Sequence, residues 1–240
     1  MFISRSMLSK NLSIITINYN NCGGLKKTIN SVIEQDYYDY QYVIIDGNSS
    51  DGSVELISGF NKYITKWISE DDMGIYHAMN KAVDIAEGEW LLFMNSGDTF
   101  YNRSSLRSAM LIADNCVDVI YSDWTYLRSG AKICADKEKM NVRHQSVIYK
   151  KSLHDVYGLY IVSPNLTISD YIFFCSISSV KWVYNNAPLS ICDEGGVSSK
   201  SSHFYQRIAT DYLFSRCNKF KLIFIYMFHP IYHKLKKYLV

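Results

Sequence analysis

Apolar runs and amphipathic segments alternate through the first hundred residues. Runs rich in β-branched and aromatic side chains predict strands over residues 12–18, 41–46, 64–69 and 90–94. Between them, apolar residues recur at helical spacing and predict helices over 25–35, 53–60 and 75–86, the last closed by Gly88. Strands that alternate with helices favour right-handed crossovers, so we expect an α/β fold with a mainly parallel central sheet.

Polar side chains gather where these four strands end. They occupy residues 18–20, 46–51, 69–72 and 95–98. In parallel sheets, ligands bind at the carboxyl ends of the strands. The shared placement predicts one binding site along this edge of the sheet.

The second half of the chain has a less regular pattern. It predicts helices over 104–115 and 168–177, and strands over 118–126, 181–184 and 189–192, with a further short strand after His144 and Gln145. A helical region is expected from residue 201 onward. Since no interdomain linker interrupts the pattern, we expect one Rossmann-like domain over 1–200, with a first half (10–100), a second half (101–200) and a tail (201–240).

Composition narrows the class of protein. The chain has 240 residues, of which 48% are hydrophobic and 20% charged, and this suits one globular domain with a real core. A net charge of +2 disfavours a nucleic-acid binder. The six cysteines form no CxxC pair, residues 1–10 do not resemble a signal peptide, and the longest apolar run (222–228) is too short to span a bilayer. We therefore expect a cytoplasmic protein with reduced thiols.

Several motifs together resemble a known enzyme family. They are SIITINYN (13–20), IIDGNSSDGS (44–53), ISEDDMGIYHAMNKAV (68–83), GEWLLFMNSGD (88–98), HQSVIYKKSL (144–153), ISDY (168–171) and GGVSS (195–199). In combination they resemble family 2 glycosyltransferases of the GT-A fold, and within them the colanic-acid and O-antigen-type bacterial enzymes. The resemblance implies inverting transfer of a sugar from a nucleotide-sugar, with UDP expected as the nucleotide. It also implies that residues 10–100 are the nucleotide-binding half and residues 101–200 the acceptor half.

The donor site is expected at the first three strand ends. Asp46 and Asp51 flank a tight turn, where a carboxylate can accept a hydrogen bond from a nucleobase or a ribose, and the resemblance places Asp46 against the base. Alternatively, Asp46 caps the next helix. Tyr19 is either a stacking platform or a core residue, and Lys81 either neutralises phosphate charge or is solvated. The full set of expected donor contacts is Thr16, Asn18, Tyr19, Asp46, Asp51, Asp72, Lys81, Asn95, Ser96 and His144.

A metal site is expected at residues 95–98. By resemblance, this is where the family keeps a DxD motif whose acids hold a divalent cation against the donor diphosphate. Here only Asp98 is acidic, and Asn95 and Gly97 stand at the other positions. We expect Mg²⁺ or Mn²⁺ with Asp98 as the main protein ligand, because Mg²⁺ binds with few protein ligands.

An inverting transfer also needs a general base for the acceptor hydroxyl. Asp170 matches the family's base position, although an Asp at a helix start can equally be an N-cap. His144 is a second titratable candidate. Asp123 and Asp193 end predicted strands and are weaker candidates for the acceptor cleft.

The tail combines aromatic, aliphatic and basic residues. Its cations include Arg216, Lys219, Lys221, Lys234, Lys236 and Lys237. This basic amphipathic pattern favours peripheral attachment to the inner face of a membrane, where lipid-linked acceptors reside; the alternative is a helix pair packed on the catalytic domain. Two other functions stay open: a sugar-1-phosphate nucleotidyltransferase, and an inactive glycan-binding or scaffold subunit.

Overall fold

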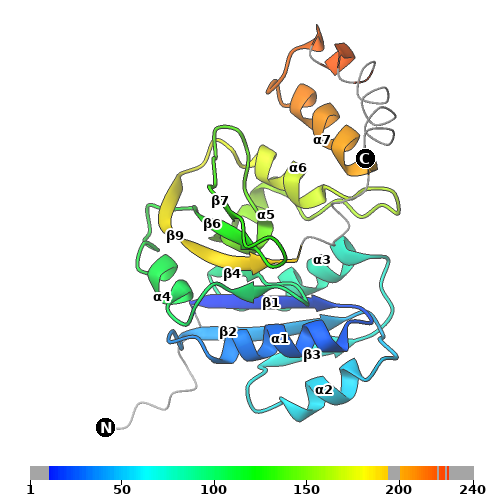
Figure 1. Cartoon of the computed structure of the whole chain (residues 1–240), viewed down its shortest axis with the longest axis vertical. Helices are drawn as coiled ribbons and strands as arrows, with labels where there is room; N and C mark the ends of the chain where they lie inside the picture. The colour runs from blue at the N-terminus through cyan, green and yellow to red at the C-terminus, as the bar shows by residue number, and fades with distance from the viewer. Residues whose placement is uncertain (1–10, 194–200, 221, 225, 227–240) are drawn as a thin grey trace.

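The sheet at the centre of the molecule combines nine strands (Figure 1). The computed structural model describes residues 11–193, 201–220, 222–224 and 226, and the expectations for 1–10, 195–199, Lys221, Lys234, Lys236 and Lys237 lie outside them. The strand order is β3-β2-β1-β4-β8-β6-β9-β5, with β7 paired to β6. The strands are β1 (Leu12–Asn18), β2 (Tyr40–Asp46), β3 (Lys66–Ser69), β4 (Trp90–Phe93), β5 (Thr99–Phe100), β6 (Val119–Tyr126), β7 (Lys132–Ile133), β8 (Val147–Lys150) and β9 (Trp182–Cys192).

The first four strands confirm the predicted parallel arrangement. β1 pairs in parallel with β2 and with β4, and β2 pairs in parallel with β3. Their carboxyl ends therefore meet at one edge, as in other α/β sheets. The register aligns Asn18 with Asp46 and Asp46 with Ser69.

The second half of the sheet is mixed. β8 runs antiparallel to both of its neighbours, β4 and β6, whereas β6 and β9 are parallel. The two strands predicted over 181–184 and 189–192 are one strand, β9, so that prediction is corrected. A register shift between Ser122 and Trp124 of β6 accommodates the polar residues in the middle of β9.

Helices cover both faces of the sheet. They are α1 (Cys22–Ile33), α2 (Ser53–Gly59), α3 (Ile75–Ile85), α4 (Ser105–Met110), α5 (Leu153–Tyr157), α6 (Ser169–Ser176) and α7 (Ser201–Leu213), with a 3-10 turn η1 (His144–Ser146). One core packs β1 residues Ile15 and Ile17 against α3 and α6, and the other packs Leu12 and Ile14 against α1, α2 and α4. Burial on both faces explains why β1 is apolar throughout instead of alternating.

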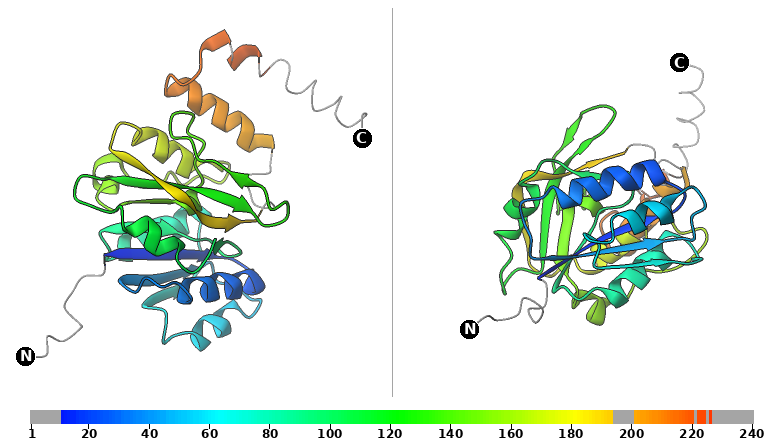
Figure 2. Two further views of the ribbon diagram at one scale, coloured as in Figure 1. Left: turned by 60° about the vertical axis from the view of Figure 1, so that its left-hand side comes forward. Right: turned by 90° about the horizontal axis from the view of Figure 1, so that it is seen from below.

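The C-terminal helix α7 lies at the end of the molecule opposite β2 and β3 (Figures 1 and 2). It stands beside α6, and the Tyr171 hydroxyl of α6 donates a hydrogen bond to Asp211 of α7. The tail therefore begins next to the second half of the chain. In the described part of the chain, no helix has the length and apolarity that crossing a membrane requires.

Candidate active site

Asp46 joins the ends of the first three strands. Its carboxylate accepts hydrogen bonds from Asn18 Nδ2 (2.7 Å), the Ser49 backbone N–H (2.9 Å), Ser49 Oγ (2.6 Å) and Ser69 Oγ (2.8 Å). Burial raises the pKa of this carboxyl, but these donors more than offset it, and the pKa lies below its ordinary value. Asp46 is therefore an ionised link between β1, β2 and β3.

Two of the predicted donor contacts have their polar atoms engaged within the protein. Asp46 is fully buried and its carboxylate already accepts from four donors. Thr16 is also fully buried; its hydroxyl donates to the Met94 carbonyl (2.8 Å) and lies 3.0 Å from the Tyr42 hydroxyl. Side chains on a sheet covered on both faces point into a core, and this is why Thr16 does not reach the site.

Tyr19, Gly47 and Asp72 form a shelf next to Asp46, on which the Tyr19 side chain is exposed. A Cβ atom built on Gly47 would lie 2.8 Å from Asp72 Oδ2 and 3.1 Å from the Tyr19 ring, so the glycine allows these two side chains to close over the backbone. Tyr19 is 67% exposed, which excludes the core alternative for this residue. Asp51 instead accepts from the Cys22 backbone N–H (2.7 Å) and from Ser53 Oγ (2.6 Å), and so fixes the starts of α1 and α2.

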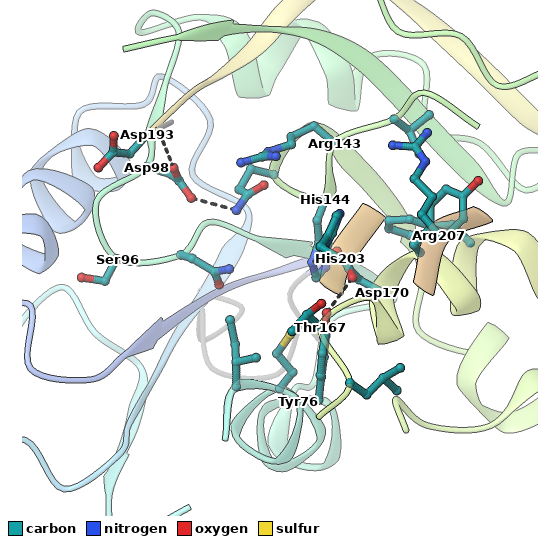
Figure 3. A pocket seen from close by; sticks show the side chains of 18 of the residues that line it. Tyr76, Ser96, Asp98, Arg143, His144, Thr167, Asp170, Asp193, His203 and Arg207 are labelled. Carbon is teal, nitrogen blue, oxygen red and sulfur yellow. Dashed lines mark hydrogen bonds and ion pairs between the residues drawn. The ribbon is translucent and has the colours of Figure 1, made fainter. Parts of the chain in front are cut away.

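A cavity of about 430 Å³ opens beyond the end of β4 (Figure 3). Five of the predicted site residues line it: Asn95, Ser96, Asp98, His144 and Asp170. They come from the loop after β4, from η1 and from α6. In Figure 3, Asp98 and Asp170 stand on different sides of the cavity, with Arg143 and His144 between them in that view.

Asp98 is held in place by the second half of the chain. Its Oδ2 accepts from Gln145 Nε2 (2.8 Å) and its Oδ1 from the Asp193 backbone N–H (3.0 Å). Burial raises the pKa of this carboxyl to about 6, although the two hydrogen bonds and the charge of Arg143 act in the opposite direction. The buried surroundings of the Asp98 carboxylate disfavour its negative charge, so a positively charged partner would stabilise it.

Asp170 stands in the first turn of α6. Its Oδ1 accepts a hydrogen bond from the Tyr76 hydroxyl (2.8 Å), and its Oδ2 lies 3.7 Å from His144 Nδ1. The N-cap of α6 is Ile168, and no side chain caps this helix, so the cap alternative for Asp170 is not supported. The carboxylate is 28% exposed and can meet a ligand in the cavity.

Three basic residues of the cavity were missed by the sequence analysis. Arg143, His203 and Arg207 line it, the last two from α7. Lys81 does not line it; its ammonium lies 2.7 Å from Glu70 Oε1 and bonds the Asp71 carbonyl (3.0 Å). The only available signal was the position of Arg143 next to His144, since nothing local distinguishes Arg207 from other tail cations.

Unpartnered polar atoms point to a ligand. Six buried side-chain nitrogen or oxygen atoms among the described residues have no hydrogen-bond partner, and three of these line the cavity: Asn95 Oδ1, Arg143 Nε and His203 Nδ1. Buried polar atoms are normally paired, so such a cluster is typical of a binding site. An acceptor oxygen and two nitrogens are available to a polar, charged ligand.

The two weaker candidates for the acceptor cleft, Asp193 and Asp123, lie in different places. Asp193 lines the cavity, and its carboxylate lies 3.2 Å from Arg128 Nε. Asp123 does not line it. Its carboxylate is buried and accepts from Tyr184 (2.7 Å), the Ala135 N–H (2.9 Å) and Lys132 Nζ (3.1 Å), so it holds the β6–β7 hairpin against β9.

Comparison with known proteins identifies the family. The family model described as "Glycosyl transferase family 2" matches residues 13–183. A PGL/p-HBAD biosynthesis glycosyltransferase of Mycobacterium bovis is 30% identical over 165 residues, which are 64% of this chain and 64% of that protein. The chain therefore spans less than two thirds of the length of that relative.

Solved structures share the fold. Residues 1–349 of S. aureus TarS, in complex with UDP-GlcNAc, superpose with a TM-score of 0.71 at 17% identity, over 82% of this chain and 64% of that one. The mannosyltransferase PcManGT of Pyrobaculum calidifontis, in complex with GDP-Man and Mn²⁺, gives 0.65 at 16% identity, over 89% and 66% of the two chains. These similarities confirm the predicted GT-A fold.

Proposed function

Because the chain belongs to glycosyl transferase family 2, we propose that its cavity performs inverting transfer of a sugar from a UDP-sugar to a glycan or lipid-linked acceptor in surface polysaccharide synthesis. The observation that carries this proposal is a pair of carboxylates on different sides of one cavity, whose lining also holds unpartnered polar atoms. In Figure 3, Arg143 and His144 stand between Asp98 and Asp170.

Asp170 is the proposed general base. Its carboxylate faces the cavity and accepts a hydrogen bond from the buried Tyr76, which fixes its orientation. The acceptor hydroxyl gives its proton to Asp170 as its oxygen bonds the anomeric carbon, and the donor's C–O electron pair leaves with the diphosphate. Attack on the face opposite the leaving group inverts the configuration.

The donor is proposed to lie between Arg143 and the shelf at Gly47. The guanidinium of Arg143 has an unpartnered Nε in the cavity, where it can meet a phosphate oxygen. The exposed ring of Tyr19 and the carboxylate of Asp72 offer a stacking surface and an acceptor to the base. UDP is the nucleotide expected from the sequence.

A divalent cation fits the donor side. Asp98 supplies one carboxylate and Asn95 an unpartnered amide oxygen, and hard cations prefer such oxygen ligands. The described residues contain no cluster of three metal-ligating side chains, so Mg²⁺ or Mn²⁺ would complete its shell with phosphate and water oxygens. When bound, such an ion neutralises charge on the leaving diphosphate.

Nucleotide-induced thermal stabilisation tests this function. UDP and UDP-sugars with Mg²⁺ or Mn²⁺ are expected to raise the melting temperature more than GDP, because a ligand at 100 times its Kd adds about 2.7 kcal/mol. UMP, which lacks the second phosphate, is the control. Equal responses to UMP and UDP would contradict the diphosphate site, and a larger response to GDP would overturn the choice of nucleotide.

One arginine variant and one lysine variant refine the same experiment. Arg143→Gln is expected to lose most of the UDP response, whereas Lys81→Gln keeps it because Lys81 lies outside the cavity and pairs with Glu70. The reverse result would restore the predicted role of Lys81.

The tail is proposed to hold the enzyme on the inner face of the membrane. From the end of α7 onward, large apolar side chains are exposed, and Lys219 stands among them; they are Leu213, Phe214, Phe220, Ile223, Phe224 and Tyr226. Since His203 and Arg207 of α7 line the cavity, this apolar surface would bring the cavity to a lipid-linked acceptor.

Charged substitutions on this surface test membrane attachment. Phe220→Glu with Phe224→Glu is expected to release the protein from vesicles containing phosphatidylglycerol while the UDP response is kept, because burial of aromatic side chains is lost and negative charge is added. Leu111→Glu with Val156→Glu is the matched control, since both residues are exposed outside the tail. Vesicle binding that survives the tail variant would place the membrane contact elsewhere, and absence of vesicle binding in the parent would favour a helix packed on the domain.

A further inference from the structure

A row of buried hydrogen-bonding side chains runs behind Asp170. His144 Nε2 lies 3.5 Å from the Tyr160 hydroxyl, which lies 2.6 Å from the Tyr149 hydroxyl, which in turn lies 3.0 Å from His154 Nε2. All four side chains are buried. The row therefore connects the cavity with α5 without passing through solvent.

The direction of the row is set at its α5 end. His154 Nδ1 lies 3.0 Å from the carbonyl oxygen of Gly158, and because a carbonyl only accepts, His154 carries its proton on Nδ1. The positive φ of Gly158 (85°) and its N–H bond to the His154 carbonyl (3.0 Å) fix that carbonyl. Burial lowers the pKa of His154, so the neutral ring has a free acceptor at Nε2.

Each hydrogen bond in the row then fixes the direction of the next one. Tyr149 donates to His154 Nε2, the Tyr149 oxygen accepts from Tyr160, and the Tyr160 oxygen accepts from His144 Nε2. Burial lowers the pKa of the His144 imidazole to about 4, and the neighbouring positive charge of Arg143 acts in the same direction, against the opposing charge of Asp170. A neutral His144 with its proton on Nε2 has a lone pair on Nδ1.

Aromatic packing keeps the lone pair of His144 Nδ1 directed at Asp170. The His144 ring lies with its centroid 4.8 Å from that of Phe93 and 5.6 Å from that of Phe174, so it has little freedom to turn. Its Nδ1 lies 3.7 Å from Asp170 Oδ2, which is longer than a hydrogen bond. A lone pair facing an ionised carboxylate accounts for that separation.

We propose that the row Tyr160–Tyr149–His154 holds His144 in the Nε2–H tautomer, so that its Nδ1 receives a hydrogen bond from Asp170 only after Asp170 has taken the acceptor's proton. This rests on Asp170 as the proposed base. In the opposite tautomer, Nδ1–H would bond the ionised carboxylate and oppose proton uptake. His144 is thus a positioning residue that favours the protonated form of the base, reached as the sugar is transferred.

Tyr160→Phe tests the proposal, because it removes the hydroxyl that accepts from His144. ¹⁵N NMR of histidine-labelled full-length protein is expected to show His144 as Nε2–H in the parent and a shift to Nδ1–H in the variant. We expect kcat to fall about 10–100-fold, which is less than the full general-base contribution of about 10²–10⁴-fold because Asp170 itself is kept, while the donor KM stays within about twofold. Tyr149→Phe breaks the next link and should act in the same direction if Tyr160→Phe does not fold.

Tyr42→Phe is the matched control. It also removes a hydroxyl from a fully buried tyrosine, but that hydroxyl meets Thr16 and not the row. An Nδ1–H tautomer in the parent, or parental kcat in both row variants, would overturn the proposal. If Asp170→Asn retains transfer, the base assignment fails, and the NMR result still decides the tautomer on its own.

Discussion

Asp170→Asn is expected to reduce sugar transfer by about 10²–10⁴-fold, which is the usual contribution of a general base. An amide cannot take the acceptor's proton, although its oxygen can still accept the hydrogen bond from Tyr76. Donor binding and melting temperature should therefore stay close to those of the parent. Initial rates with the full-length protein, together with UDP-induced stabilisation, measure the two effects separately.

Asp211→Asn provides a matched control for this substitution. Asp211 also accepts a hydrogen bond from a tyrosine hydroxyl, that of Tyr171, but it does not line the cavity. The same chemical change there should leave the transfer rate within about twofold of the parent, as for most surface substitutions. Turnover that survives in Asp170→Asn would move the base to His144 or Asp193, which also line the cavity.

Asp98→Asn is expected to abolish cation-dependent donor binding and to lower transfer by about 10²–10³-fold, because a hard cation contributes several kcal/mol of charge stabilisation at a leaving diphosphate. The amide keeps the size of the side chain, so Gln145 and Asp193 retain a neighbour of similar shape. Calorimetric titration of UDP with and without Mn²⁺ measures the loss. Full parental activity in excess chelator would contradict the role of Asp98.

The same site predicts a pH dependence. The pKa of the Asp98 carboxyl is raised to about 6 by burial, so cation-dependent UDP binding in the parent should weaken as the pH falls through 6. The stability of the ligand-free protein changes with pH in the opposite direction. Because the folded protein holds the Asp98 proton more tightly than the unfolded chain does, this group stabilises the fold at a pH below the ordinary carboxyl pKa. That contribution is lost as the pH rises through 6. Asp98→Asn should show neither change in this range.

Local pattern predicted the first half of the fold closely. Continuous apolar runs mark strands covered on both faces, and these gave β1, β2 and β4 within one residue at each end. Helix starts were less accurate: α1 begins at Cys22 rather than residue 25 because Asn21 caps it through Gly24 N–H. β9 was divided because Asn185, Asn186 and Pro188 resemble a turn, but Asn185 is buried and bonds Ser122.

The sequence predicted which residues lie near the cavity better than it predicted where their side chains point. The sequence placed Asp98 and Asp170 correctly at the cavity, since both follow from the order of elements and the family motifs. It could not show that Asp46 turns inward to join three strands. Nor could it show Arg143 and Gln145 meeting Asp98, because contacts between residues about fifty positions apart leave no local signal.

The mixed second half of the sheet also has a consequence for how the chain acquires its structure. β1 to β4 are complete by residue 93, whereas Asp98 is fixed by a hydrogen bond from a residue 95 positions later. Pairings that close long loops form late in folding. The shelf formed by Tyr19, Gly47 and Asp72 can thus assemble early, whereas the Asp98 carboxylate is fixed only once β9 has inserted between β6 and β5. We therefore expect the cavity to be completed later in folding than the four parallel strands.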